Sequence, residues 1–112
     1  MQSVPNARAF VDGVWRGLQF ADHEGIAHIE RNYALTGRPE ESGPFTQPAL
    51  FITGRQDHVV GYRDAWAVVG HYPRATFAVL DAAGHNTHID QLDVTAALIT
   101  EWLARIRAES QR

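Results

Sequence analysis

The chain contains no cysteine and no lysine among its 112 residues. Without cysteine, disulfide bonds, thiolate metal sites and a cysteine nucleophile are all excluded. The ten basic side chains are all arginines, and with thirteen acidic residues they leave a formal net charge of −3. This balance argues against a nucleic-acid partner, because proteins that bind nucleic acid typically carry a basic patch or stripe.

Long apolar runs are missing as well. No apolar run exceeds about six residues, whereas a membrane-spanning helix needs roughly twenty. The N-terminal sequence MQSVPNARAF lacks the basic start and apolar core of a signal peptide. We therefore expect a cytoplasmic protein that has no membrane partner and needs no cofactor.

The first part of the chain has the pattern of two amphipathic helices. Apolar residues recur at three- and four-residue spacings over residues 6–20 and again over 21–35, where Asp22 is placed as an N-cap. Three aromatic residues here are expected either to pack between the helices or to line a substrate pocket: Trp15, Phe20 and Tyr33.

Residues 36–48 then collect two glycines and three prolines, which is typical of a linker. We therefore divide the chain into a cap-like helical segment with its linker, residues 1–45, and a second part, residues 46–112.

In the second part the pattern alternates between strand and helix. Residues 49–53 and 75–80 are predicted strands, and helical spacing follows each of them, over 62–72 and from about 90 to 108. A crossover of about twenty residues between two strands predicts a parallel pair, and hence the α/β class. A parallel sheet of two strands leaves both of its outer edges unpaired. We therefore expect these two strands to be part of a larger sheet, and we expect the chain to self-associate through an exposed strand edge.

Two polar residues follow the predicted strands. Asp57 lies four residues past the first strand and His85 five past the second, directly after Gly84. Because parallel strands end at the same edge of a sheet, these two side chains are expected to meet there. An aspartate that accepts a hydrogen bond from histidine Nδ1–H prepares the imidazole as a general base, and Gly84 is expected to provide the sharp turn that presents it.

The segments PALFITGRQD and YPRATFAVLDAAGHNTHID resemble the C-terminal part of an α/β-hydrolase. The resemblance covers residues 48–106, and residues 1–45 are loosely similar to the helical cap that often precedes this part of the fold. It implies that Asp57 is the acid and His85 the base of a catalytic triad. The implied reaction is hydrolysis of an ester or C–C bond in a small-molecule substrate by acyl transfer.

The family's nucleophile is absent from this sequence. The three serines are Ser3, Ser42 and Ser110, and none lies in the family's Gly-x-Ser-x-Gly motif. We therefore expect the chain to be a C-terminal portion of a hydrolase, inactive by itself.

Two other interpretations remain open. The chain could be a non-catalytic remnant that serves as an interaction or dimerisation module. Alternatively, the two loops could bind a metal ion through four side chains: Asp57, His58, His85 and His88. The sequence has no His-Glu-x-x-His motif. If no metal is bound, His88 or Asp90 is expected to cap the last helix.

Overall fold

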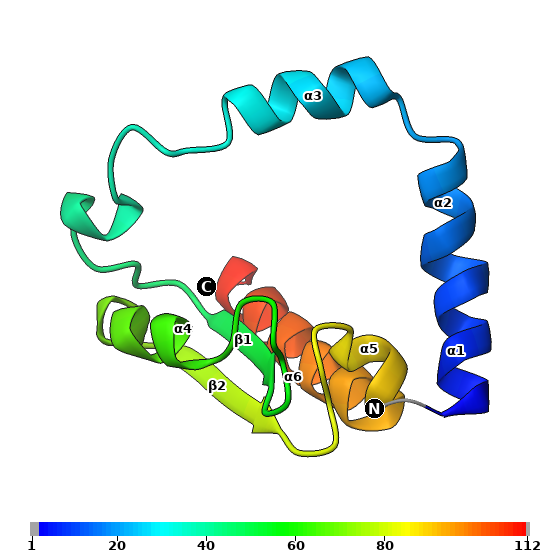
Figure 1. The fold of residues 1–112 in the computed structure, drawn as a ribbon. Helices are drawn as coiled ribbons and strands as arrows, with labels where there is room; N and C mark the ends of the chain where they lie inside the picture. Colours follow the sequence, from blue (N-terminus) through cyan, green and yellow to red (C-terminus); the bar gives the residue numbers. More distant parts are fainter. Residues whose placement is uncertain (1–2, 112) are drawn as a thin grey trace. The chain divides into compact units, whose positions relative to one another are not determined.

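The computed structural model describes residues 3–111, which divide into two compact units, 3–42 and 43–111. The first unit is purely helical, and the second holds both strands (Figure 1). The described chain is therefore mixed α/β, which confirms the predicted class.

The first unit begins with a continuous helical stretch formed by α1 (Val4–Phe10), the π-helical turn η1 (Val11–Trp15) and α2 (Arg16–Gln19). The Oγ atom of Ser3 caps its start by accepting a hydrogen bond from the Asn6 N–H at 3.2 Å. The predicted helix is present, but its middle turn is widened to the π form.

The second helix of this unit, α3 (His23–Arg31), starts where the sequence predicts. The Oδ1 atom of Asp22 accepts hydrogen bonds from the N–H groups of Glu24 and Gly25, both at 3.1 Å, as an N-cap does. The helix ends four residues earlier than expected, because the Asn32 side chain donates to the carbonyl of His28 at the C-cap.

Beyond α3, a short 3-10 turn, η2 (Pro39–Ser42), closes the first unit, and none of residues 3–42 is buried. The side chains of Trp15, Phe20 and Tyr33 are 52%, 88% and 81% exposed. The prediction that they pack between the helices was therefore wrong. The helices form from local signals, and they bury no aromatic residue.

The second unit is built on a parallel pair of strands, β1 (Ala49–Gly54) and β2 (Ala75–Leu80). Their register pairs Ala49 with Ala75 and runs without a break to Gly54 with Leu80. The strands lie where the sequence predicts, with β1 longer by one residue.

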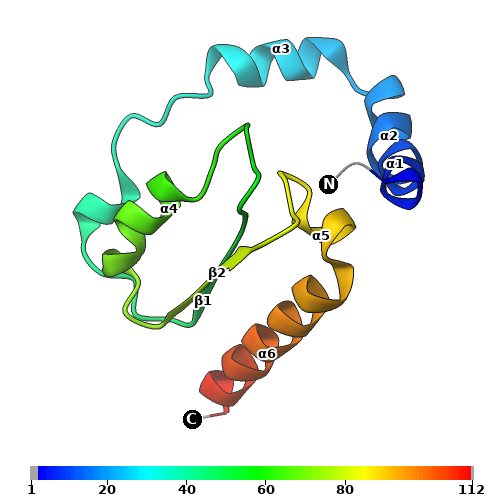
Figure 2. The ribbon, with the colours of Figure 1, turned by 60° about the horizontal axis from the view of Figure 1, so that its bottom comes forward.

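Helices follow each strand. The crossover contains α4 (Arg63–Val68) and the 3-10 turn η3 (Val69–His71), and β2 leads into α5 (Thr87–Asp90) and α6 (Leu92–Ser110). Figure 2 shows α4 and α6 on opposite faces of the sheet. Among the helices of residues 3–111, none combines the length and apolarity that a membrane crossing requires.

Side chains that alternate along β2 contact the two covering helices. The ring of Phe77 meets that of Trp66 in α4 edge to face, with centroids 5.1 Å apart. Its neighbour Thr76 points to the other face, where the hydroxyl accepts a hydrogen bond from Arg105 of α6 at 2.8 Å. This alternation is the period of two expected of a strand, with both faces covered.

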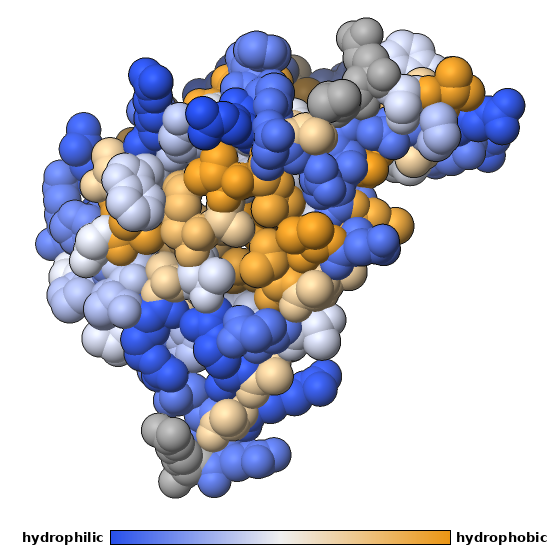
Figure 3. Space-filling model, turned by 90° about the horizontal axis from the view of Figure 1, so that it is seen from below, coloured by the Kyte–Doolittle hydropathy of each residue, from blue (hydrophilic) through white to orange (hydrophobic). Residues whose placement is uncertain are grey.

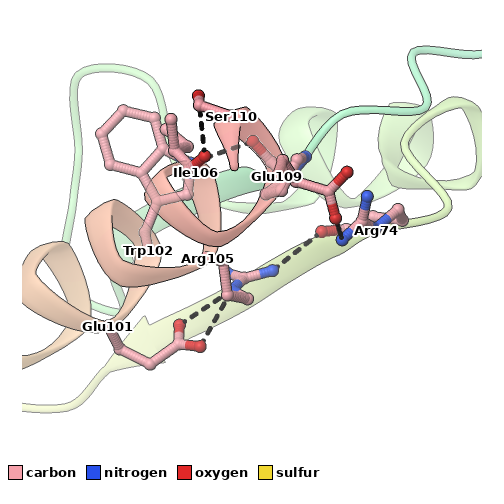
Figure 4. A network of polar contacts seen from close by, with 8 residues as sticks. Arg74, Glu101, Trp102, Arg105, Ile106, Glu109 and Ser110 are labelled. Carbon is pink, nitrogen blue, oxygen red and sulfur yellow. Dashed lines mark hydrogen bonds and ion pairs between the residues drawn. The ribbon is translucent and has the colours of Figure 1, made fainter. Parts of the chain in front are cut away.

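A polar network ties α6 to the start of β2 (Figure 4). The guanidinium of Arg105 also donates to the carbonyl of Arg74 at 3.1 Å and pairs with Glu101 at 2.9 Å. Arg74 in turn pairs with Glu109 at 2.6 Å. The side chain of Arg105 thus docks α6 on the sheet.

The sheet unit encloses very little core. In residues 3–111, only Pro48, Gly54, Ala83 and Thr95 are buried, and the remaining residues of both strands are half-exposed. Figure 3 shows apolar side chains gathered in the middle of the face seen from below, where β2 is the nearer strand. A two-stranded parallel sheet with both outer edges unpaired buries much less than parallel sheets usually do.

Candidate functional site

The two parallel strands end at the same edge of the sheet, and the predicted pair of side chains meets there. Asp57 follows β1 after a tight turn in which its N–H donates to the carbonyl of Gly54 at 3.2 Å. His85 follows β2 by five residues. The Oδ2 atom of Asp57 lies 3.2 Å from Nδ1 of His85, across a sequence separation of 28 residues.

The Asp57 carboxylate is fixed by its own turn. Its Oδ1 atom accepts hydrogen bonds from the N–H groups of Val59 at 2.8 Å and Val60 at 3.3 Å. Burial of the carboxylate raises its pKa, but the bonds from Val59, from His85 and from Val60 outweigh this and hold the pKa of Asp57 below its ordinary value of 3.8. The group is therefore ionised at neutral pH.

The ionised carboxylate determines which nitrogen of His85 carries the proton. A carboxylate can only accept, so the facing Nδ1 must donate, and the neutral imidazole then keeps Nε2 free to take up a proton. The side chain of Asp57 is 8% exposed and that of His85 is 52% exposed. A sheltered acid thus orients an imidazole that solvent and ligands can reach, which is the arrangement of a general base with its orienting group.

A close approach of the two loops brings the pair together. A Cβ atom added to Gly54 would collide with the carbonyl oxygen of Gly84 and lie 2.5 Å from that of Ala83. No side chain larger than hydrogen fits at this position. Glycine at the end of β1 therefore lets the loop that carries His85 pass directly over the strand end.

The glycine next to His85 has a different role from the predicted one. Gly84 has no positive φ, and a Cβ there would make ordinary contacts, 3.6 Å from Oδ2 of Asp90. The left-handed residue of this loop is Ala82, at φ 54°. The sharp turn was therefore assigned to the wrong residue. The backbone of Gly84 is instead held by its N–H, which donates to Asp90 at 2.8 Å.

Asp90 binds this loop and does not cap the last helix. The capping position of α6 is Gln91, which makes no side-chain cap bond and donates to the carbonyl of Asp81 at 2.9 Å. The expectation that His88 or Asp90 caps the last helix was therefore wrong. The sequence offers no periodic or motif signal for such contacts, because they depend on how the two loops cross.

The histidines near the pair do not form a metal centre with it. Within residues 3–111, no three histidine or acidic side chains converge in a way that could hold a metal ion. Of the four suggested ligands, only Asp57 and His85 are brought into contact, and His58 and His88 do not join them.

Each serine hydroxyl is engaged with nearby backbone. The Oγ atom of Ser3 caps α1, that of Ser42 donates to the carbonyl of Pro39 at 2.6 Å, and that of Ser110 donates to the carbonyl of Ile106 at 3.2 Å. Local structure presents none of them as an activated nucleophile.

No protein-family model, no curated protein and no solved structure matches this chain. A functional assignment therefore depends on the contact between Asp57 and His85 and on the strands that position it.

Proposed function

We propose that residues 43–111 form the acid-and-base portion of an α/β-hydrolase that cleaves an ester or C–C bond in a small molecule. The observation that carries this proposal is the 3.2 Å contact between Oδ2 of Asp57 and Nδ1 of His85 at the ends of two adjacent parallel strands. The sheltered carboxylate and the accessible imidazole suit the roles of orienting acid and general base.

In this mechanism Nε2 of His85 takes the proton of a serine hydroxyl as the serine oxygen attacks the substrate carbonyl carbon. Asp57 stabilises the imidazolium that results. The imidazolium then donates its proton to the leaving group, and a water molecule, activated in the same way, releases the acyl product. The serine comes from a segment or chain outside residues 3–111, because all three serines of this sequence lack the elbow motif.

The first test concerns the pair itself. Nitrogen-15 NMR of His85 is expected to show the Nδ1–H tautomer in the 112-residue chain, and Asp57→Asn is expected to abolish that preference. The proposed acid and base roles would be contradicted by a wild-type His85 that is mainly in the Nε2–H form. They would also be contradicted by a tautomer population that does not change in Asp57→Asn.

The second test concerns catalysis. The 112-residue chain is expected to hydrolyse p-nitrophenyl acetate no faster than its His85→Ala variant, since a triad without its serine loses on the order of 10⁶ in turnover. The reading frame upstream of Met1 is then searched for a strand followed by Gly-x-Ser-x-Gly. If it encodes one, the longer protein is expected to be an esterase that the His85→Ala substitution inactivates. An esterase whose activity is unchanged by His85→Ala would contradict the proposal.

A second candidate is a non-catalytic interaction module. It is favoured by the small number of buried residues and by the unpaired outer edges of β1 and β2. Such edges pair readily with another chain. Light scattering after size-exclusion chromatography tests this: a concentration-dependent dimer supports it, and a monomer at high concentration contradicts it.

A further inference from the structure

The side chain of Gln56 connects the loop that carries Asp57 to the loop that carries His85. Its Nε2 atom donates to Oδ1 of Asp81 at 2.7 Å, and its Oε1 atom accepts from the N–H of Ala83 at 3.1 Å. The main-chain N–H of Gln56 also donates to the carbonyl of Ala83, at 2.9 Å. One residue therefore makes three hydrogen bonds across the gap between the loops.

These bonds flank the proposed acid and base in sequence. Gln56 directly precedes Asp57, and Ala83 lies two residues before His85. Both the N–H and the carbonyl of Ala83 are hydrogen-bonded to Gln56, so the loop cannot shift along β1 without breaking both bonds. These three bonds form a clamp, and they hold the loop at the fully buried Ala83, two residues before the half-exposed His85.

A glutamine amide suits these partners chemically. It must donate to a carboxylate and accept from an N–H with the same planar group, which a glutamate cannot do while ionised. Asp81 is ionised, because the bonds from Gln56 and from the Ala82 N–H hold its pKa below the ordinary value. A carboxylate at position 56 would therefore face a second carboxylate.

We propose that Gln56 is the positioning residue of the acid–base pair: it fixes the crossing of the two loops so that Nδ1 of His85 faces Asp57. This inference rests on the proposed function of that pair. Gln56 touches no reacting atom and acts through the backbone of Ala83.

The test follows the tautomer of His85 by nitrogen-15 NMR in the full 112-residue chain. Gln56→Glu is expected to cause loss of the predominant Nδ1–H form, because repulsion from Asp81 opens the clamp. The double variant Gln56→Glu/Asp81→Asn restores a donor and an acceptor in swapped positions, and it is expected to recover the wild-type tautomer.

Two controls separate positioning from general stability. Gln47→Glu makes the same charge change at an exposed glutamine outside both loops and is expected to leave the tautomer unchanged. Trp102→Phe removes the hydrogen bond from Trp102 Nε1 to the carbonyl of Pro48 at the far end of β1. It is expected to lower the melting temperature without moving the tautomer.

The outcomes are distinguishable. A wild-type chain without an Asp57-dependent Nδ1–H form would overturn the proposed function, and the inference with it. A normal wild type whose tautomer survives Gln56→Glu, or a swapped pair that fails to recover it, would overturn the role of Gln56 alone. If Gln56→Glu does not fold, Gln56→Ala takes its place, because it removes both side-chain bonds of Gln56, to Asp81 and to the Ala83 N–H. An unchanged tautomer in that variant overturns the role of Gln56 equally.

Discussion

Residues 3–42 and residues 43–111 are held by different kinds of contact. In the first unit the side chains of Ser3 and Asp22 cap helices by bonding to backbone two or three residues away. In the second, side chains bond across 25 to 54 residues, from Thr53 to Ala78 and from Trp102 to Pro48. Both units contain regular structure, but only the long-range contacts bring chemical groups from distant positions together.

The two units also differ in how much their helices and strands are stabilised by burial. A short helix such as α3 is marginal in water unless its apolar face is packed, and no residue of 3–42 is buried. The sheet unit buries four residues, and two of them, Gly54 and Ala83, lie where the two loops cross. A change at that crossing is therefore expected to destabilise the second unit.

The largest effect is expected from Gly54→Ala. Its new methyl group would collide with the Gly84 and Ala83 carbonyls, and overpacking of this kind costs about 3 kcal/mol. Gly84→Ala adds the same methyl group in ordinary contact distance and should cost below about 1 kcal/mol. Urea unfolding followed by hydrogen exchange of β1 and β2 compares the two variants; equal losses would mean that the loops do not cross as closely as described.

A smaller effect is expected from Asp22→Ala in the other unit. Loss of an aspartate N-cap costs about 1 kcal/mol of helix stability. Amide exchange in α3 should accelerate, whereas exchange in β1 and β2 should stay at the wild-type rate. Faster exchange in the strands would contradict the expectation that the cap acts only within α3.

The smallest effect is expected from Asp57→Asn, because an asparagine oxygen can still accept from Val59. The folded-state pKa of Asp57 lies below the ordinary 3.8, so its ionised form stabilises the fold above that pH. This contribution is lost as the pH falls through the folded value. Wild type should be the more stable protein at pH 7, and urea midpoints should converge with those of Asp57→Asn below pH 3.8; a gap that widens in acid would contradict the sign.

Much of the local structure was predictable because it depends on neighbours in sequence. Asp22 caps α3 as the pattern indicated, and β2 spans the residues that the apolar run predicted. The pairing of Asp57 with His85 also followed from the sequence, since parallel strands must end at one edge.

The errors lie where contacts are not local. Trp15 and Tyr33 have the spacing of a packed face, but periodicity cannot tell whether a partner surface is present, and both side chains are exposed. The turn assigned to Gly84 falls at Ala82, and the glycine that the geometry requires is Gly54. The sequence shows only that a glycine can adopt backbone conformations and close contacts that other residues cannot. Whether the fold requires a glycine at that position depends on the backbone atoms packed against it.

The sequence by itself determined the elements, the parallel order of the strands and the two residues placed at their common edge, because these follow from periodicity and chain connectivity. The tertiary structure alone decided which groups hold them there. The clamp made by Gln56, the grip of Asp90 on Gly84 and the docking of α6 by Arg105 depend on distances between segments far apart in the chain. Such distances are set by how whole elements pack, which no local pattern encodes.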